Sequence, residues 1–439
     1  MKRIILVIFL IAVAAGVSWT ANFYRENLQG AFPAFRKPSQ DIAELIERAA
    51  TTSPAAVPSE RASPNEVGRD NKTEMSPQDG ANLAQLGGPL KIPDGFSISI
   101  FAKNLPGARV MKLDLFGNMW VSRTGDGAVT LLEINDDGTI NHQGDIFRNL
   151  RKPHGLAFDP ESPSALYIAE EHQIKRVAVY SEDEGSKIID LPYGKGHFTR
   201  TIEFGPDGKL YISTGSSCNV CRESDEHRAT ILSYDLETQK TEIFARGLRN
   251  AVFFTWHPET KKMWATEMGR DLLGDDIPPD EINRVDAGGN FGWPTCFGKN
   301  IHDSDFDQNT YIRNPCMEPF ETPSYIDLQA HSAPLGLAFI PAEAEWPEEY
   351  WHDLLVAYHG SWNKTEPTGY KIVRFKLDKD GKYLVAGSVN SPQAEDFITG
   401  WLTPNREVLG RPVDILVHSG AIYISDDKAG VIYKVAPQN

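Results

Sequence analysis

The sequence predicts an all-β protein whose folded part is a six-bladed β-propeller, preceded by an N-terminal signal or anchor segment and a linker. A three-strand cycle with Gly, Asp or Pro turns recurs after Leu90. The closer repeats are about 40–50 residues apart, the length of one propeller blade. No stretch of this region keeps a helical period. The second strands of the six cycles are NMWVS around Trp120, ALYIAE around Tyr167, KLYISTG around Tyr211, KMWATE around Trp264, DLLVAYHG around Leu355 and AIYISD around Tyr423.

Residues 1–21 have the pattern of a secretory signal peptide or a membrane anchor. Lys2 and Arg3 precede an apolar run from Ile4 to Val17, and a short positive region before about 7–15 apolar residues is typical of exported proteins. Extended to Ala21, the apolar segment is near the lower limit of about 17–25 residues for a spanning helix. We therefore expect export to the periplasm, with this segment either cleaved or kept as an anchor.

Residues 22–89 are predicted to be a linker. Asp41–Ala50 (DIAELIERAA) has its large apolar residues on one helical face and indicates a short helix. Thr51–Gly88 is rich in Ser, Pro, Asn, Asp and Ala and has too few large apolar residues to form a core. The propeller domain should then occupy residues 90–439.

The strand that opens this domain is expected to complete its last blade. The segment Phe96–Ala102 (FSISIFA) would then close the ring and protect the sheet edges. A large sandwich or two small β domains are the alternatives, but six cycles without an intervening linker favour the ring. In a ring, loops from different blades meet at the mouth of the central channel. Residues far apart in the sequence can therefore form one site.

The charge balance limits the possible partners. The 439 residues include 44 Lys and Arg against 60 Asp and Glu, a formal net charge of −16. This surplus disfavours broad binding to nucleic acid or to anionic lipid. An anionic ligand would need a local cationic site.

Histidine and arginine recur just before the first strand of several blades, where an apolar residue would serve the fold better. One such residue alone is more often structural than functional, but the recurrence in four blades predicts a site at one rim of the channel. The residues are His154 in PHGLAFDP, His197 in GHFTRTIEFGPDG, Arg249 and Asn250 in GLRNAVFFTWHP, and Arg411 in GRPVDILV.

These segments, with DEINRVDAGGNFGWP, HSAPLGLAFIP and YHGSWN, resemble the pyrroloquinoline quinone (PQQ) dependent sugar dehydrogenases. These are six-bladed propellers, and the resemblance is to the sorbosone dehydrogenase-like and soluble aldose sugar dehydrogenase-like members. It runs from about Ile92 to Val435. It implies oxidation of an aldose or related sugar, at a hydroxyl or aldehyde, by hydride transfer to the quinone. The chain has no CxxCH haem motif, so electrons would pass to a separate acceptor, a quinone or a cytochrome.

By position, the resemblance implies a role for each of the rim residues. His197 would be the general base that takes the proton of the sugar hydroxyl, because a neutral imidazole accepts a proton near neutral pH. Arg249, Asn250 and Arg411 would hold PQQ, since guanidinium groups bind carboxylates by paired hydrogen bonds. The family's cofactor-contacting lysine has no clear counterpart here, and His359 or Lys364 could take its place.

The resemblance also implies a calcium ion, held partly by the backbone carbonyls of Gly269 and Arg270. Such an ion would polarise the quinone. Arg270 stands where the better-known glucose enzymes have proline, so a positive side chain adjoins the predicted metal site. His154 and His331 are assigned to the substrate side of the pocket.

Four cysteines allow three disulfide connectivities, and we favour Cys218–Cys221 with Cys296–Cys316. In an exported chain a structural disulfide is expected. The pair in CNVC lacks both the histidine of a haem site and the thioredoxin-like setting of a redox motif. Zinc binding is the weaker interpretation.

Two other functions compete with the sugar dehydrogenase. A calcium-dependent lactonase or esterase on a similar propeller would need Asp, Glu and Asn side chains at the channel, where this chain offers His and Arg. A non-catalytic propeller that binds a carbohydrate or a protein is the other alternative.

Overall fold

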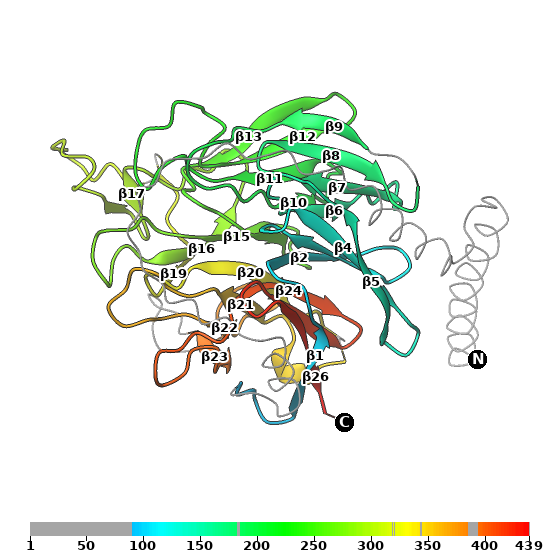
Figure 1. The fold of residues 1–439 in the computed structure, drawn as a ribbon. Helices are drawn as coiled ribbons and strands as arrows, with labels where there is room; N and C mark the ends of the chain where they lie inside the picture. Colours follow the sequence, from blue (N-terminus) through cyan, green and yellow to red (C-terminus); the bar gives the residue numbers. More distant parts are fainter. Residues whose placement is uncertain are drawn as a thin grey trace, which may run out of the picture. The chain divides into compact units, whose positions relative to one another are not determined.

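Six four-stranded antiparallel sheets surround a common axis in the computed structural model of the chain (Figure 1). The structure describes residues 90–181, 185–317, 319, 321–342, 345–384 and 394–438. The predicted signal or anchor segment and the predicted linker with its short helix lie outside these residues. Within the described part, no helix is long and apolar enough to cross a membrane. The prediction of an all-β, six-bladed propeller is confirmed.

Strands of each blade follow one another outward from the axis, and the chain passes through the blades in sequence order. The first three blades, from inside to outside, are β2 (Ala108–Leu113), β3 (Met119–Arg123), β4 (Ala128–Ile134) and β5 (Ile140–Phe147); β6 (Leu156–Phe158), β7 (Ala165–Ala169), β8 (Gln173–Ala178) and β9 (Ser186–Asp190); and β10 (Ile202–Phe204), β11 (Leu210–Thr214), β12 (Thr230–Asp235) and β13 (Lys240–Arg246).

The other three blades follow the same order, with one insertion in blade four and the ring closure in blade six. They are β14 (Phe254–Trp256), β15 (Met263–Glu267), β16 (Asp280–Val285) and β19 (Ile326–Leu328); β20 (Pro334–Phe339), β21 (Leu354–Tyr358), β22 (Lys371–Phe375) and β23 (Glu395–Ile398); and β24 (Pro412–His418), β25 (Ala421–Asp426), β26 (Val431–Pro437) and β1 (Phe96–Ala102). The insertion carries the hairpin of β17 (Cys296–Phe297) and β18 (Ile301–His302), and a 3-10 turn η1 (Glu348–Tyr350) precedes β21.

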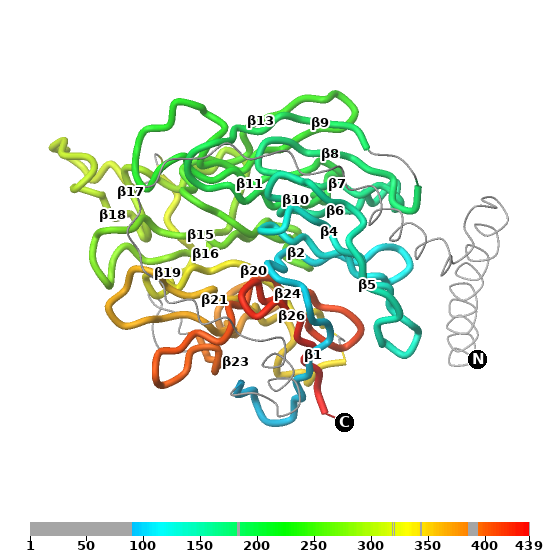
Figure 2. The backbone as a smooth tube through the Cα atoms, viewed as in Figure 1, coloured from blue at the N-terminus to red at the C-terminus, as the bar shows by residue number. Residues whose placement is uncertain are grey.

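The first strand of the domain closes the ring, as predicted. β1 pairs antiparallel with β26, so Ile98 lies opposite Val435 and Ser99 opposite Lys434. The blue N-terminal strand and the red C-terminal strand lie side by side in Figure 2. Because both ends of the domain share one sheet, the last blade is complete and β26 is not left as an edge strand.

The aromatic residues that mark the repeats join neighbouring blades. In blades one to four, the ring in the second strand contacts an aromatic ring at the end of the next blade's inner strand. The pairs, with centroid distances, are Trp120–Phe158 at 6.3 Å, Tyr167–Phe204 at 5.3 Å, Tyr211–Trp256 at 4.9 Å and Trp264–Phe339 at 5.3 Å. Each second-strand ring is at most 5% exposed, so the repeated motif supplies the core between blades.

Inner strands from five blades line a cavity of about 260 Å³ on the axis. Its walls come from β2, β10, β14, β20 and β24. In an antiparallel blade, the start of the inner strand and the end of the second strand lie at the same end of the sheet. The loops before the inner strands and after the second strands therefore share one end of the ring, which we call the loop face.

Candidate active site

The predicted catalytic, cofactor, substrate and metal residues lie in loops of the loop face, together with Cys218 and Cys221, whereas Cys296 and Cys316 lie in the insertion between β16 and β19. His154, His197, Arg249, Asn250, His331 and Arg411 precede inner strands, whereas Cys218, Cys221, Gly269, Arg270, His359 and Lys364 follow second strands. Strand order alone thus collects residues from blades two to six at one end of the ring. Their individual surroundings differ, and these decide what each residue can do.

Main-chain hydrogen bonds align blades two, three and four, and they separate two sets of rim residues. The aligned bonds run from Ala169 to Gly155, from Ser213 to Thr201 and from Thr266 to Phe253. His197 and Arg249 each lie four residues before the aligned position and are equivalent. His154 lies one residue before it, as Arg200 does. The expectation that His154 matches His197 and Arg249 is therefore wrong, because His154 is three residues further into the blade, where its side chain is fully buried.

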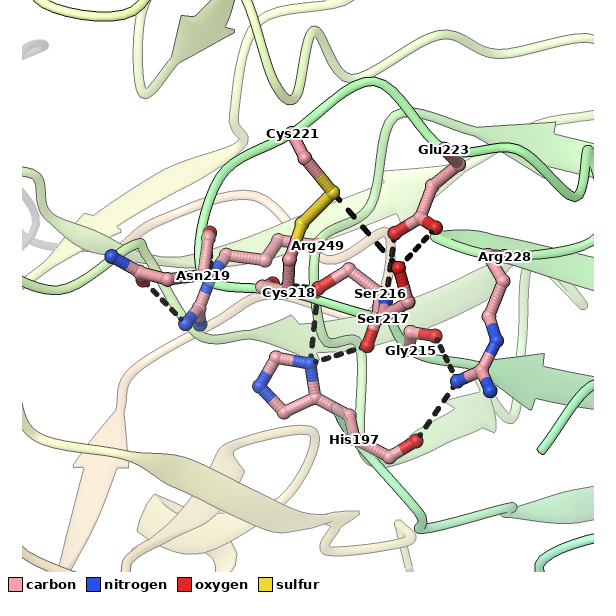
Figure 3. The surroundings of a disulfide bond; sticks show 10 residues. All are labelled: His197, Gly215, Ser216, Ser217, Cys218, Asn219, Cys221, Glu223, Arg228 and Arg249. Atoms are coloured by element: carbon pink, nitrogen blue, oxygen red, sulfur yellow. Dashed lines mark hydrogen bonds between the residues drawn. A yellow bond between two sulfur atoms is a disulfide. The ribbon is translucent and has the colours of Figure 1, made fainter. Parts of the chain in front are cut away.

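His197 is held on both its ring and its main chain. Its Nδ1 lies 3.1 Å from the carbonyl oxygen of Ser216 and 3.0 Å from the Ser216 hydroxyl (Figure 3). The carbonyl can only accept a hydrogen bond, so Nδ1 carries the proton and Nε2 keeps its lone pair. The main-chain oxygen of His197 accepts hydrogen bonds from Arg200 and Arg228 at 3.1 and 3.2 Å. The imidazole is therefore fixed in the tautomer that a general base needs.

Burial and nearby positive charge keep this imidazole neutral. Burial, with the charges of Arg249, Arg200 and Arg228, lowers the pKa of His197 to about 3. Arg200 is itself fully buried, donates to three main-chain carbonyls and makes no ion pair among the described residues. Burial and Arg228 lower the pKa of Arg200 to about 9, so it is charged at neutral pH. A surplus of positive charge thus lies beneath His197.

Every N–H group of the Arg249 side chain already has a partner in the protein. Nε donates to the Asn219 carbonyl at 2.8 Å and Nη2 to the Asn219 Oδ1 at 2.9 Å, which is a paired contact with one residue. Nη1 donates to the carbonyls of Gly269 and Met268 at 2.9 and 3.3 Å, and Nη2 also pairs with Asp271 at 3.2 Å. In this conformation Arg249 therefore offers charge to a ligand, and no free N–H.

Asn250 and His197 both lie close to Gly215. A Cβ atom added at Gly215 would come within 2.6 Å of the His197 Cβ and 2.7 Å of the Asn250 Oδ1. The main-chain N–H of Asn250 donates to Glu267 at 3.1 Å. Glu267 is buried, which raises its pKa well above the ordinary value. Gly215 thus allows the predicted base and the predicted cofactor residue to approach each other.

Arg411 belongs to a second polar cluster, on blades five, six and one. Its Nε and Nη2 donate to the carbonyls of His359 and Gly360 at 3.1 and 2.8 Å, and its Nη1 has no hydrogen-bond partner among the described residues. His359 Nε2 lies 3.0 Å from both carboxylate oxygens of Asp427, and Arg109 pairs with the same carboxylate at 2.8 Å. Burial lowers the pKa of His359 to about 4, so it is neutral.

Three other predicted residues serve the structure of the loop face. His154 packs its ring against Phe253 at 5.3 Å and has no exposed surface. Lys364 Nζ donates to the Asp275 carbonyl, and His331 Nε2 lies 2.8 Å from the Gly274 carbonyl. Both contacts hold the loop between β15 and β16. The substrate and cofactor roles of these residues stay predictions.

The predicted calcium position does not offer a calcium ligand set. The Gly269 carbonyl accepts from Arg249, and Arg270 pairs with Asp303 at 2.6 Å. Calcium in proteins takes 6–8 oxygen ligands, but the Gly269 carbonyl already accepts from the Arg249 guanidinium. Among the described residues, the one group of three close His, Cys, Asp or Glu ligand atoms is Cys218, Cys221 and Glu223. The protein groups alone do not fit the ion, so we derive no step from it.

Both predicted disulfides are present. Cys218 is bonded to Cys221 and Cys296 to Cys316, so neither pair is free to bind zinc.

Sequence reasoning missed several residues that shape the site. They are Ser216 and Asn219 in the loop after β11, Arg200 and Arg228 behind His197, and Arg109 with Asp427 in the second cluster. Arg109 is the second residue of inner strand β2 and Arg200 lies just before β10, so the same search for His and Arg at strand starts could have found them. Ser216, Asn219 and Asp427 follow second strands and carry no such signal.

The six-bladed propeller agrees with the comparisons to known proteins. The model of the TrAA12-like family matches residues 90–438. The chain therefore belongs to the TrAA12-like family. A relative from Borreliella burgdorferi, an uncharacterized protein, is 34% identical over 365 residues, which cover 79% of this chain and 90% of that protein.

Solved structures share the fold at lower identity. Iodide and calcium structures of the Trichoderma reesei family AA12 enzyme each have a TM-score of 0.68 at 20% identity and cover 80% of this chain. The matched regions cover 98% of the chain in the iodide structure and 97% of the chain in the calcium structure. The holo form of the pyranose dehydrogenase PQQ domain from Coprinopsis cinerea has a TM-score of 0.66 at 19% identity, over 79% of this chain and 97% of that domain.

Proposed function

We propose that this protein is a PQQ-dependent oxidoreductase that oxidises an aldose or related sugar, with His197 as the general base. The observation that carries the proposal is the state of His197. Its Nδ1 is held by Ser216 and its pKa is low, so Nε2 is an available proton acceptor at neutral pH. The family membership and the PQQ domain among the similar structures support this proposal.

The charges at the loop face fit the proposed cofactor. When bound, PQQ supplies a quinone that accepts a hydride, together with three carboxylates that need cationic partners. Arg411 Nη1 has no hydrogen-bond partner in the described part of the chain, and Arg249, Arg200 and Arg228 add positive charge around His197. In a chain of net charge −16, this concentration of arginine is suited to an anionic ligand. Asn250 lies close enough to His197 to contact the same ligand.

Each of these residues has a separate task in the proposed reaction. Nε2 of His197 takes the proton from the substrate hydroxyl, while its Nδ1–H stays bonded to Ser216. The positive charges of Arg200 and Arg228, which lie beside the His197 main chain, disfavour protonation of the ring. Arg411 offers its Nη1 to a carboxylate of the cofactor, whereas Arg249 attracts the cofactor by its charge. No step is assigned to the calcium ion that the resemblance implies, because the protein groups at its predicted position do not fit it.

Reconstitution of the purified protein with PQQ tests the proposal directly. We expect PQQ to bind and a panel of aldoses to reduce an artificial dye acceptor, because the physiological acceptor is proposed to be a separate quinone or cytochrome. Failure of the protein to bind PQQ, with or without added calcium, would refute the proposal. Export to the periplasm is likewise proposed, and fractionation of cells that express the full chain would test it.

A further inference from the structure

The Cys218–Cys221 disulfide closes a small loop beside the proposed active site. The sulfur atoms join residues three positions apart, and Asn219 lies between them. The loop follows β11, and Figure 3 shows it next to both His197 and Arg249. We refer to residues 216–221 as the disulfide loop. The sequence predicts a role only for its two cysteines, as a structural disulfide.

Asn219 uses both its main chain and its side chain to fix Arg249. Its carbonyl and Oδ1 accept from Nε and Nη2 of Arg249 at 2.8 and 2.9 Å. The same Oδ1 also accepts from the Asp271 N–H at 2.8 Å, and Nδ2 donates to the Asp271 carbonyl at 3.0 Å. One asparagine therefore ties the guanidinium to the loop after β15, and no polar atom of its side chain is idle.

Ser216 connects the same loop to His197. Its hydroxyl lies 3.0 Å from His197 Nδ1 and donates to the Cys218 carbonyl at 2.6 Å (Figure 3). Since a hydroxyl that donates to one group can still accept from another, this arrangement requires Nδ1 to be the donor. The position of Cys218 therefore bears on the tautomer of the imidazole.

We propose that the disulfide loop is a positioning unit, in which Asn219, constrained by the Cys218–Cys221 bond, holds Arg249, and Ser216 holds His197. Removing the bond or the Asn219 side chain leaves the fold in place but lets the Arg249 guanidinium move. Loss of a hydrogen bond to a charged group typically changes an equilibrium about 10- to 100-fold. The proposal rests on the proposed function only where the readout is PQQ binding.

The first experiment needs no cofactor. Hydrogen exchange measured by mass spectrometry on the cofactor-free full chain compares Asn219→Ala and the pair Cys218→Ser/Cys221→Ser with wild type. We expect faster exchange in peptides that cover residues 247–253 and 268–271. Asn135→Ala, which removes a hydrogen-bonded asparagine from an exposed turn, is the matched control. Exchange in those two segments that equals wild type in both variants would overturn the proposal, whatever the cofactor proves to be.

The second experiment measures PQQ affinity and its additivity. We expect Asn219→Ala and Cys218→Ser/Cys221→Ser each to weaken PQQ binding about 10- to 100-fold. The variant that combines all three substitutions should bind PQQ no more weakly than whichever of these two variants binds it more weakly. Cys296→Ser/Cys316→Ser should leave the affinity within about twofold of wild type while lowering the melting temperature. Fully additive losses, or an equal loss from both disulfides, would overturn the positioning role. A wild type that binds no PQQ refutes the proposed function and leaves the exchange experiment to decide this inference.

Discussion

Replacing His197 tests the proposed catalytic base most directly. In His197→Gln the amide can still donate to Ser216, but it has no basic nitrogen. General-base catalysis contributes about 10²–10⁴-fold to rate, which is about 2.7–5.5 kcal/mol in the barrier. We expect dye-linked turnover with sugar to fall by that factor. PQQ affinity should change less than about threefold, because the neutral His197 ring adds no charge to the cofactor site.

The pH dependence follows from the low pKa of His197. Burial and Arg249 lower it to about 3, so the ring is neutral from pH 5 to 8 and wild-type kcat/KM should show no acid limb from this group in that range. The unfolded chain, with a histidine pKa of about 6.5, binds the extra proton at pH 5. Folding stability therefore falls as the pH drops below 6.5, by about 2 kcal/mol at pH 5 from this residue.

Calorimetry at pH 8 and pH 5 measures that contribution. For a domain of this size, about 2 kcal/mol corresponds to about 3 °C, so the loss in melting temperature between the two pH values should be about 3 °C smaller in His197→Gln. The control is His227→Gln, whose side chain is 42% exposed and pairs with Asp225. Turnover above about a tenth of wild type in His197→Gln, or an acid limb near pH 6.5 in wild type that the variant lacks, would refute the reasoning.

Four further predictions concern single features of the structure. Gly215→Ala should lower turnover at least 10-fold, because a Cβ there would come within 2.6 Å of the His197 Cβ. The control Gly125→Ala, where an added Cβ meets open space, should be active, and wild-type activity in Gly215→Ala would contradict the close approach. Burial raises the Glu267 pKa in the folded chain, so wild type loses stability as the pH rises above the pKa of an unfolded glutamate. Glu267→Gln has no carboxyl to ionise and should therefore be more stable relative to wild type at pH 8 than at pH 5, by about 1.4 kcal/mol for each pH unit between the unfolded and the folded pKa. Thermal unfolding measures the difference, and its absence would argue that the carboxyl titrates normally. Cys296→Ser/Cys316→Ser opens a loop of 20 residues and should cost about 3 kcal/mol, against about 2 kcal/mol for the shorter Cys218–Cys221 loop; denaturant unfolding that gives the reverse order would contradict the loop-length argument. Calcium without PQQ should shift the melting temperature by less than about 1 °C, because Gly269 and Asp271 are engaged by Arg249 and a weakly bound ligand stabilises the folded chain little. A shift of several degrees would reveal a calcium site formed by the protein alone.

Local sequence pattern predicted correctly which end of the ring the rim residues occupy, but not how deeply each side chain is buried. His197 and Arg249 were predicted to be equivalent, and the blade register confirms it. His154 looked similar in sequence but belongs with Arg200, three residues further into the strand, because strand starts shift between blades. A motif near the start of a strand shows at which end of the sheet its residues lie. How far a side chain is buried inside the blade depends on the register of that strand with its neighbour.

The sequence by itself determined the ring, its closure by Phe96–Ala102 and the end of the ring where the chosen residues gather. These features follow from strand periodicity, turn residues and aromatic positions, which are local. For the disulfides the sequence favoured one of three pairings, and the structure decided in its favour. Only the tertiary structure decided that Ser216 sets the tautomer of His197. The same is true of the partners that engage every N–H of Arg249, which are Asn219, Met268, Gly269 and Asp271. Those partners lie 19 to 30 residues away along the chain. Hydrogen bonds at such separations depend on how loops from different strands converge, which no local pattern specifies.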